Sequence, residues 1–191
     1  MNLFLKEILE QPDALEYTFN FYINDNRGKE LLETAQKLIK ENKISHVVIT
    51  GMGSSYYNSL LLYYNLRSHG ISCEIVDTSE LFQYFAPNQI KSLYIFVSQS
   101  GESGEIVKTF STWGEAFLKE HLVWGITNTP HSTLGNKASL IFPTLAGNET
   151  SVTSKTYTTG LLVSYLLSKA IIGEHPFPEY GRILDTVLHT R

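Results

Sequence analysis

Short apolar runs alternate with segments of helical pattern along most of the chain. Continuous apolar or β-branched runs predict buried strands at 46–50, 71–76, 93–97, 122–126 and 140–142. Helices are predicted after these runs at 56–70, 78–85, 104–117 and 156–172, and a turn with a short helix is predicted over 128–134. Strands separated by helices in this way predict a parallel sheet that is covered on both faces and joined by right-handed crossovers.

The same pattern divides the chain into three parts. Residues 1–44 are expected to form helices that pack on the domain, with Pro12 at a helix start. Residues 45–173 carry the alternation of strands and helices and form the α/β domain. Residues 174–191 read as a linker with a short helix at 179–188. The fold class is therefore α/β, a three-layer sandwich around about five parallel strands.

Two strand ends combine glycine with hydroxyl side chains. The first predicted strand ends in Gly51–Ser55, and the third ends in Ser98–Ser103. In a flavodoxin-like strand order the ligand site lies between strands 1 and 3, so both segments are expected at one crevice. Free N–H groups at helix starts bind anions, and residues 97–104 contain no Lys or Arg. A small phosphorylated ligand fits a site built from such neutral donors. The alternative is a Ser/Gly turn whose side chains only cap the helix.

Composition narrows the classes of partner. Hydrophobic residues at 42%, charged residues at 18% and a net charge of −4 are typical of a globular protein and argue against nucleic acid or an anionic membrane. Cys73 is the single cysteine, so neither a disulfide nor a cysteine metal cluster is expected. No window approaches the ~20 apolar residues of a membrane span. We expect a cytoplasmic protein without metal or cofactor.

A dinucleotide site is the competing interpretation of the first glycine segment. Gly51-x-Gly53 with Asp77 at the end of the second strand resembles part of a nucleotide fingerprint. The third position of that motif is Tyr56 instead of Gly or Ala, and the chain contains no Walker-type motif. Nicotinamide binding therefore ranks below phosphosugar binding.

Four segments, in order, resemble the sugar isomerase (SIS) domain family, in particular the isomerase half of glucosamine-6-phosphate synthase and its deglycase and amino-sugar isomerase relatives. The segments are 53–56, 98–103, 127–134 and 146–159, and Ser-Gln-Ser-Gly-Glu at 98–102 is the most specific. The resemblance covers roughly residues 45–173. It implies that the phosphate is wrapped by Ser98, Gln99, Ser100 and Ser103. It further implies that Ser55 lies near the sugar, that Gly53 and Ser54 belong to the same binding site, and that either Thr153 or Ser154 contacts the sugar.

The same resemblance leaves the catalytic base unassigned. These relatives carry two such domains in tandem, and their proton-transferring residues belong to the second domain or the tail. Glu149 is a candidate base, beside the alternative that it holds the loop to the next helix, and in a stand-alone isomerase the base would be Glu102, Glu105 or Glu149. The segment from Glu149 to Lys155 is one residue shorter than the usual form, which is why Thr153 and Ser154 remain alternatives.

Three functions follow. The first is part of a sugar-phosphate isomerase, aminotransferase or deglycase that acts on fructose 6-phosphate, glucosamine 6-phosphate or a similar compound. The second is a module that senses a sugar phosphate without turnover, and the third is a stand-alone aldose–ketose isomerase. The helix around 161–167 is apolar nearly all round, so we also expect a homodimer or a second SIS domain to cover it.

Overall fold

A five-stranded parallel sheet lies at the centre of the computed structural model, which describes residues 2–150, 152–174 and 185. The strands are β1 (Val47–Gly51), β2 (Cys73–Asp77), β3 (Leu93–Val97), β4 (Leu122–Thr127) and β5 (Leu140–Pro143). Their order is β2-β1-β3-β4-β5, and every neighbouring pair is parallel. This is the flavodoxin-like order, so the predicted fold class is confirmed.

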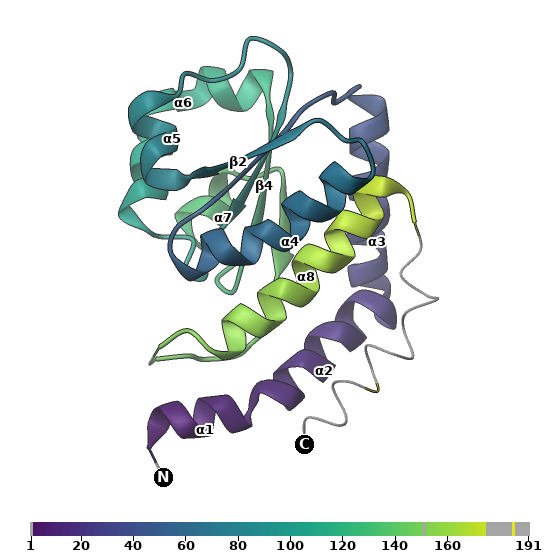
Figure 1. Cartoon of the computed structure of the whole chain (residues 1–191), viewed down its shortest axis with the longest axis vertical. Coiled ribbons are helices and arrows are strands. Elements are labelled where there is room, and N and C mark those ends of the chain that lie inside the picture. Colours follow the sequence, from purple (N-terminus) through teal and green to yellow (C-terminus); the bar gives the residue numbers. More distant parts are fainter. Residues whose placement is uncertain (1, 151, 175–184, 186–191) are drawn as a thin grey trace.

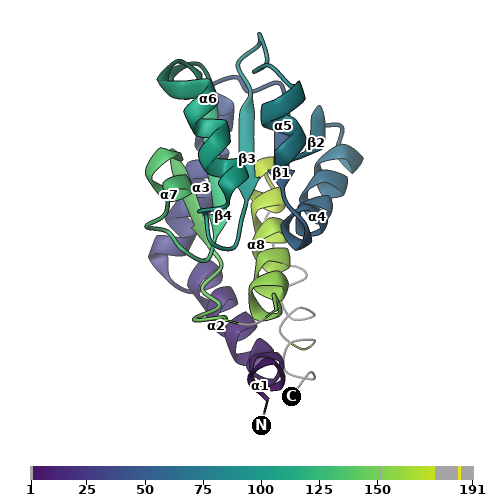
Figure 2. The same ribbon diagram turned by 90° about the vertical axis from the view of Figure 1, so that its left-hand side faces the viewer.

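Helices cover both faces of the sheet, which gives three layers (Figure 1). One face carries α4 (Ser54–Ser68) and α8 (Lys155–Ile172); the other carries α5 (Thr78–Tyr84), α6 (Gly104–Glu120) and α7 (Thr133–Lys137). Successive strand residues point to opposite faces, so Val47 and Ile49 join the first core and Val48 joins the second. Figure 2 shows α5 and α6 in front of the strands, on the side away from α3.

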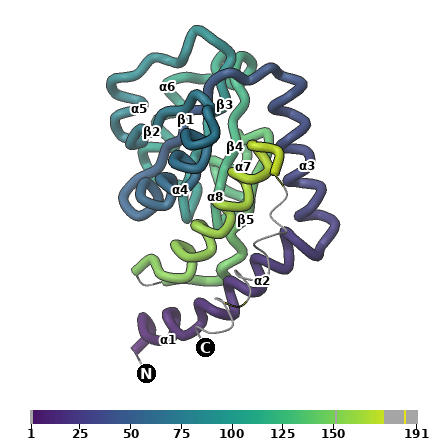
Figure 3. The backbone as a smooth tube through the Cα atoms, turned by 45° about the vertical axis from the view of Figure 1, so that its right-hand side comes forward, coloured from purple at the N-terminus to yellow at the C-terminus, as the bar shows by residue number. Residues whose placement is uncertain are grey.

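Three helices precede the sheet: α1 (Leu3–Leu9), α2 (Gln11–Ile23) and α3 (Asn26–Glu41). Figure 3 shows α2 and α3 running beside α8, with α1 projecting beyond the domain. The Thr18 hydroxyl donates to the carbonyl of Thr144 at 2.6 Å, and the Tyr22 hydroxyl donates to that of Pro143 at 2.9 Å. These two bonds fasten α2 to the chain just after β5, beside the carboxyl edge of the sheet.

Helix α8 is covered inside the chain. Leu162, Val163, Leu166 and Leu167 are buried in the core, and α2, α3 and α4 all pack against the helix. The three helices supply the apolar surface that the sheet alone lacks. Helix α8 therefore needs no second domain or subunit to cover it, contrary to the expectation from its apolar sequence, and the homodimer itself stays a prediction.

Two local details differ from the prediction. Strand β2 starts at Cys73 because Ile71 closes the end of α4, its N–H donating to the carbonyl of Leu66 at 3.1 Å. Helix α6 is interrupted at Gly114, where φ is 65° and ψ is −165°. Glycine reaches that conformation without the Cβ clash of other residues. The helix predicted at 179–188 lies outside the described residues, apart from position 185.

Within residues 2–150 and 152–174, none of the helices has the length and apolar character needed to span a bilayer.

Candidate functional site

The two glycine and serine segments meet at one crevice beyond the carboxyl ends of β1 and β3. Ser54 and Ser55 line it from the start of α4, and Ser98 and Gln99 line it from the end of β3. The two strands are neighbours, with Gly51 opposite Val97, which brings their ends together. The crevice is open to one side and has a volume of ≈ 20 Å³. That is room for about one water molecule, so a larger ligand would lie at the mouth of the crevice.

The loop from Ser98 to Ser103 is shaped by its own hydroxyl groups. The Ser98 hydroxyl accepts from the N–H of Gly101 at 3.1 Å, and the Ser100 hydroxyl accepts from the N–H of Glu102 at 3.2 Å. Ser103 is the N-cap of α6, its hydroxyl accepting from a backbone N–H of the first turn at 3.4 Å. The loop hydroxyls thus accept from three backbone N–H groups, and the first N–H groups of a helix, which have no partner within it, are the kind of donor that suits an anion.

Gly101 lets the loop pack tightly against α7. Its φ is +63°, and a Cβ there would lie 2.1 Å from the Ser132 hydroxyl oxygen. Its carbonyl accepts from the N–H of Leu134 at 3.0 Å. Glu102 also binds this neighbour, accepting from the N–H and the hydroxyl of Thr133 at 2.5 and 2.8 Å. Glu102 therefore caps α7, a structural role beside the loop.

Gln99 is held on both sides of its amide. Its Nε2 donates to Oε2 of Glu149 at 3.1 Å, and its Oε1 accepts from the Thr153 hydroxyl at 3.3 Å. Its backbone carbonyl accepts from the Thr127 hydroxyl at 3.1 Å and from the N–H of Asn128 at 3.0 Å. The residue thus joins the loop after β3 to the segments that follow β4 and precede α8.

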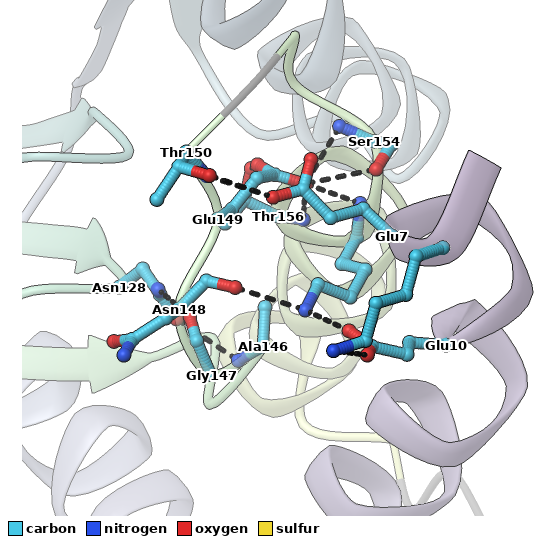
Figure 4. A network of polar contacts seen from close by, with 12 residues as sticks. Glu7, Glu10, Asn128, Ala146, Gly147, Asn148, Glu149, Thr150, Ser154 and Thr156 are labelled. Carbon is cyan, nitrogen blue, oxygen red and sulfur yellow. Dashed lines mark hydrogen bonds and ion pairs between the residues drawn. The ribbon is translucent and has the colours of Figure 1, made fainter. Parts of the chain in front are cut away.

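Glu149 closes the N-terminus of α8 (Figure 4). Its Oε1 accepts from the N–H groups of Ser154 and Lys155 at 2.8 and 2.6 Å, and its Oε2 accepts from the Thr156 hydroxyl. Burial alone would raise the pKa of this carboxyl group, but the hydrogen bonds from Thr156 and Ser154 outweigh it and lower the pKa. The carboxylate is therefore ionised at neutral pH and occupied by donors.

A second set of contacts ties α1 to the same loop (Figure 4). Buried Lys155 donates from Nζ to Glu10 Oε2 at 2.6 Å and to the carbonyl of Asn148 at 2.9 Å. Buried Glu7 accepts through Oε1 from the N–H of Thr150 at 2.8 Å. The first helix therefore braces the loop that carries Glu149.

The remaining predicted residues occupy three kinds of position. Thr153 lines the crevice, whereas Ser154 is buried and its hydroxyl donates to Glu149 at 3.0 Å. Ser100 and Ser103 belong to the loop but not to the crevice wall. Gly53, with φ of 52°, lines a separate hollow beside β2.

The sequence did not single out several residues of the crevice wall. Asn58 is the clearest: its Nδ2 donates to the carbonyl of Tyr157, and its Oδ1 accepts from the Ser164 hydroxyl, both at 2.9 Å. A Cβ on Gly160 would lie 2.4 Å from Asn58 Nδ2. The sequence signals available for this contact were the polar Asn58 in one predicted helix and Gly160 inside another. The other residues missed are Val97, Ile126, Thr127, Thr144, Thr156 and Tyr157.

The described residues contain no cluster of three or more His, Cys, Asp or Glu side chains that could hold a metal ion. Fold and site together define an α/β domain with a serine-rich loop and a crevice at the switch point of its sheet. The SIS domain family model matches residues 37–169. The chain belongs to the SIS domain family.

One curated relative is glutamine–fructose-6-phosphate aminotransferase (isomerizing) of Fusobacterium nucleatum, 35% identical over 167 residues. The match covers 86% of this chain and 27% of that protein, so this chain spans about a quarter of the relative's length. This chain resembles the isomerase part of such enzymes, as its sequence motifs predicted.

Two solved structures share the fold. A putative phosphosugar isomerase from Silicibacter pomeroyi superposes with a TM-score of 0.80 at 22% identity, covering 99% of this chain and 56% of that one. The Vibrio vulnificus NanR protein complexed with ManNAc-6P gives a TM-score of 0.67 at 17% identity, covering 99% of this chain and 68% of that one.

Proposed function

We propose that this chain binds a sugar phosphate, with the phosphate against the 98–103 loop and the sugar toward α4. The observation that carries the proposal is the convergence of Ser98 and Gln99 with Ser54 and Ser55 on one crevice. Neutral hydroxyl and amide donors at a helix start recognise a small dianion. The ManNAc-6P complex of the structural neighbour from Vibrio vulnificus supports the same class of ligand.

The ligand we propose is a ketose or amino-sugar 6-phosphate, such as fructose 6-phosphate or glucosamine 6-phosphate. The curated relative's name, an aminotransferase that uses fructose 6-phosphate, supports this choice. We further propose that the protein works in the cytoplasm, and that a second copy or a second SIS domain accompanies it.

We propose that the chain supplies the binding half of an aldose–ketose or amino-sugar reaction. A general base needs a pKa near the working pH and a free lone pair. Glu149 has a lowered pKa and already accepts from Gln99, Ser154, Lys155 and Thr156, so it serves to position these groups. A proton-transferring residue would then come from a partner unit.

Isothermal calorimetry with fructose 6-phosphate, glucosamine 6-phosphate and arabinose 5-phosphate tests the binding. Ser98→Ala and Ser100→Ala are each expected to weaken binding by about 0.5–1.5 kcal/mol, because each alters the donors around the phosphate. Ser111→Ala is the matched control: Ser111 is exposed on α6, its hydroxyl donates to the carbonyl of Lys108, and it lies away from the loop. Equal affinity for fructose and fructose 6-phosphate would refute the phosphate site.

A turnover assay with the same compounds separates a stand-alone isomerase from the other two functions. Binding without turnover is expected for this chain by itself and agrees with a binding half or a sensor. Turnover by the isolated chain would instead establish a stand-alone isomerase, and Glu149→Gln would then show whether that carboxylate takes part.

A further inference from the structure

Glu7, on α1, is a buried carboxylate without a cation beside it. Only 3% of the residue is exposed. Its Oε1 accepts from the N–H and the hydroxyl of Thr150 at 2.8 and 3.3 Å, whereas its Oε2 is buried without a hydrogen-bond partner in the part of the chain that the structure describes. No lysine, arginine or histidine among residues 2–150 and 152–174 forms an ion pair with it. Because a buried charge is costly unless it is paired and hydrogen-bonded, Oε2 needs a donor from elsewhere.

The two nearest lysines in the sequence and at the loop bind a different carboxylate. Lys155 donates to Glu10 Oε2 at 2.6 Å, and Lys6 Nζ lies 3.7 Å from Glu10 Oε1. Figure 4 shows the Glu7 carboxyl group turned toward Thr150 and away from Glu10. The positive charges at this end of the molecule therefore pair with Glu10 and leave Glu7 without a counter-charge.

A hollow of ≈ 650 Å³ opens between α1, the first half of α2 and the loop at 145–150, and Glu7 and Thr150 both line it. The described residues of its wall include three carboxylates and two ammonium groups, which belong to Glu7, Glu10, Asp13, Lys6 and Lys155. Three negative charges against two positive charges leave one negative charge in excess. The hollow therefore favours a ligand with a single positive charge.

The remainder of the wall is mostly apolar. Leu3 and Tyr17 line the hollow from the two helices and are 51% and 65% exposed, and Leu145 and Ala146 line it from the loop. Binding pockets typically combine such apolar walls with a few polar groups that fix the orientation of the ligand. A ligand with a cationic head and a hydrocarbon body matches both parts of this wall.

The surroundings of Glu7 favour an ammonium group over other cations. A guanidinium group binds a carboxylate through both oxygens, but Thr150 already occupies Oε1, whereas an ammonium group needs one oxygen. Within the described residues no cluster of three or more His, Cys, Asp or Glu side chains could hold a metal ion. The terminal torsion of a glutamate side chain is broad, so a turn of the carboxyl group would present Oε2 to the hollow.

We propose that this hollow binds a primary amine with an apolar body, its ammonium group on Glu7 Oε2 and its hydrocarbon part against Leu3 and Tyr17. The ligand supplies the donor and the positive charge that Glu7 lacks. It contacts α1, α2 and the loop together, so its binding stabilises the fold. None of the residues that line the hollow lines the crevice beyond β1 and β3, and the inference stands apart from the proposed function.

Isothermal calorimetry of the full chain with n-hexylammonium chloride tests the proposal, and n-hexanol is the uncharged analogue. We expect n-hexanol to bind about tenfold more weakly or less, because it has no charge to pair with Glu7. Glu7→Gln should weaken n-hexylammonium binding by about tenfold or more, because it removes the negative charge. Glu30→Gln, an exposed charge removal on α3, is the matched control and should bind like the parent.

The apolar wall provides a second test that leaves Glu7 in place. Tyr17→Ser should weaken n-hexylammonium binding by about threefold or more, because it removes apolar contact, whereas Tyr84→Ser, at 78% exposure on α5, should not. Circular dichroism checks that the variants stay folded; if Glu7→Gln does not fold, n-hexanol and the two tyrosine variants decide. No binding by the parent, equal affinity for n-hexanol, or unchanged affinity in both Glu7→Gln and Tyr17→Ser would overturn the proposal. Binding of Mg²⁺ in place of n-hexylammonium would also overturn it.

Discussion

Replacing Gly101 with alanine tests how the phosphate loop is built. Gly101 has φ of +63°, and a new Cβ would lie 2.1 Å from the Ser132 hydroxyl oxygen and 2.8 Å from the Ser132 Cβ. Ser132 cannot simply turn away, because its hydroxyl is the N-cap of α7 and accepts from the N–H of Gly135 at 3.2 Å. The substitution therefore perturbs both the loop backbone and the neighbouring helix.

The cost has two parts. A residue with a Cβ in the left-handed region costs about 1–2 kcal/mol, and loss of the Ser132 cap costs about 1 kcal/mol more. The free energy of unfolding should fall by about 2–3 kcal/mol, less than the roughly 5–15 kcal/mol of an ordinary domain. The variant should stay folded but hold Ser98 and Ser100 less well, so its affinity for sugar phosphate should fall too.

Urea unfolding followed by circular dichroism measures the first effect, and calorimetry measures the second. Gly104→Ala is the control, since its Cβ would meet nothing within 4 Å and it lies in the same loop-to-helix junction. We expect that control to keep the parent's stability or to gain up to about 1 kcal/mol. If Gly101→Ala unfolds within about 0.5 kcal/mol of the parent, the loop does not depend on this glycine and our reasoning is wrong.

Two further substitutions test the supports of the site. Glu149→Gln should lower the unfolding free energy at pH 7 by about 2 kcal/mol, because it weakens charge-assisted bonds, while exposed Glu30→Gln should not. The pKa of Glu149 lies below the ordinary 4.5, so its contribution is present above that pH and is lost as pH falls through the lowered pKa. The difference between Glu149→Gln and the parent should shrink in acid; a constant difference would contradict this. Tyr22→Phe should cost about 1 kcal/mol in urea unfolding by removing the bond to Pro143, whereas an equal loss in exposed Tyr17→Phe would argue against that cause.

Much of the fold could be predicted because its strands are continuous apolar runs. Val47 to Gly51 and Leu93 to Val97 are buried at every position, so their sequences carry no surface pattern that competes with the strand interpretation. The break at Gly114 could not be predicted, since a glycine inside a helical pattern is also compatible with an unbroken helix.

The candidate site likewise contains some residues that the sequence could reveal and others that it could not. Ser98 and Gln99 could be found because local sequence places them at a strand end, and the neighbouring strand brings Ser55 to them. The contact between Asn58 and Gly160 could not be found, because it depends on how closely two helices distant in sequence approach each other. Nor does the spacing around Glu149 reveal which donors surround its carboxylate.

The amide of Asn58 has a mechanical consequence. Its Nδ2 donates to the carbonyl of Tyr157 and its Oδ1 accepts from the hydroxyl of Ser164, at the position where Gly160 allows α4 and α8 to approach closely. Helices α4 and α8 are thereby joined through this amide, and Ser55 of one and Thr156 of the other line the crevice. We therefore expect a ligand that shifts Ser55 to shift α8 as well, because the Asn58 amide joins the two helices.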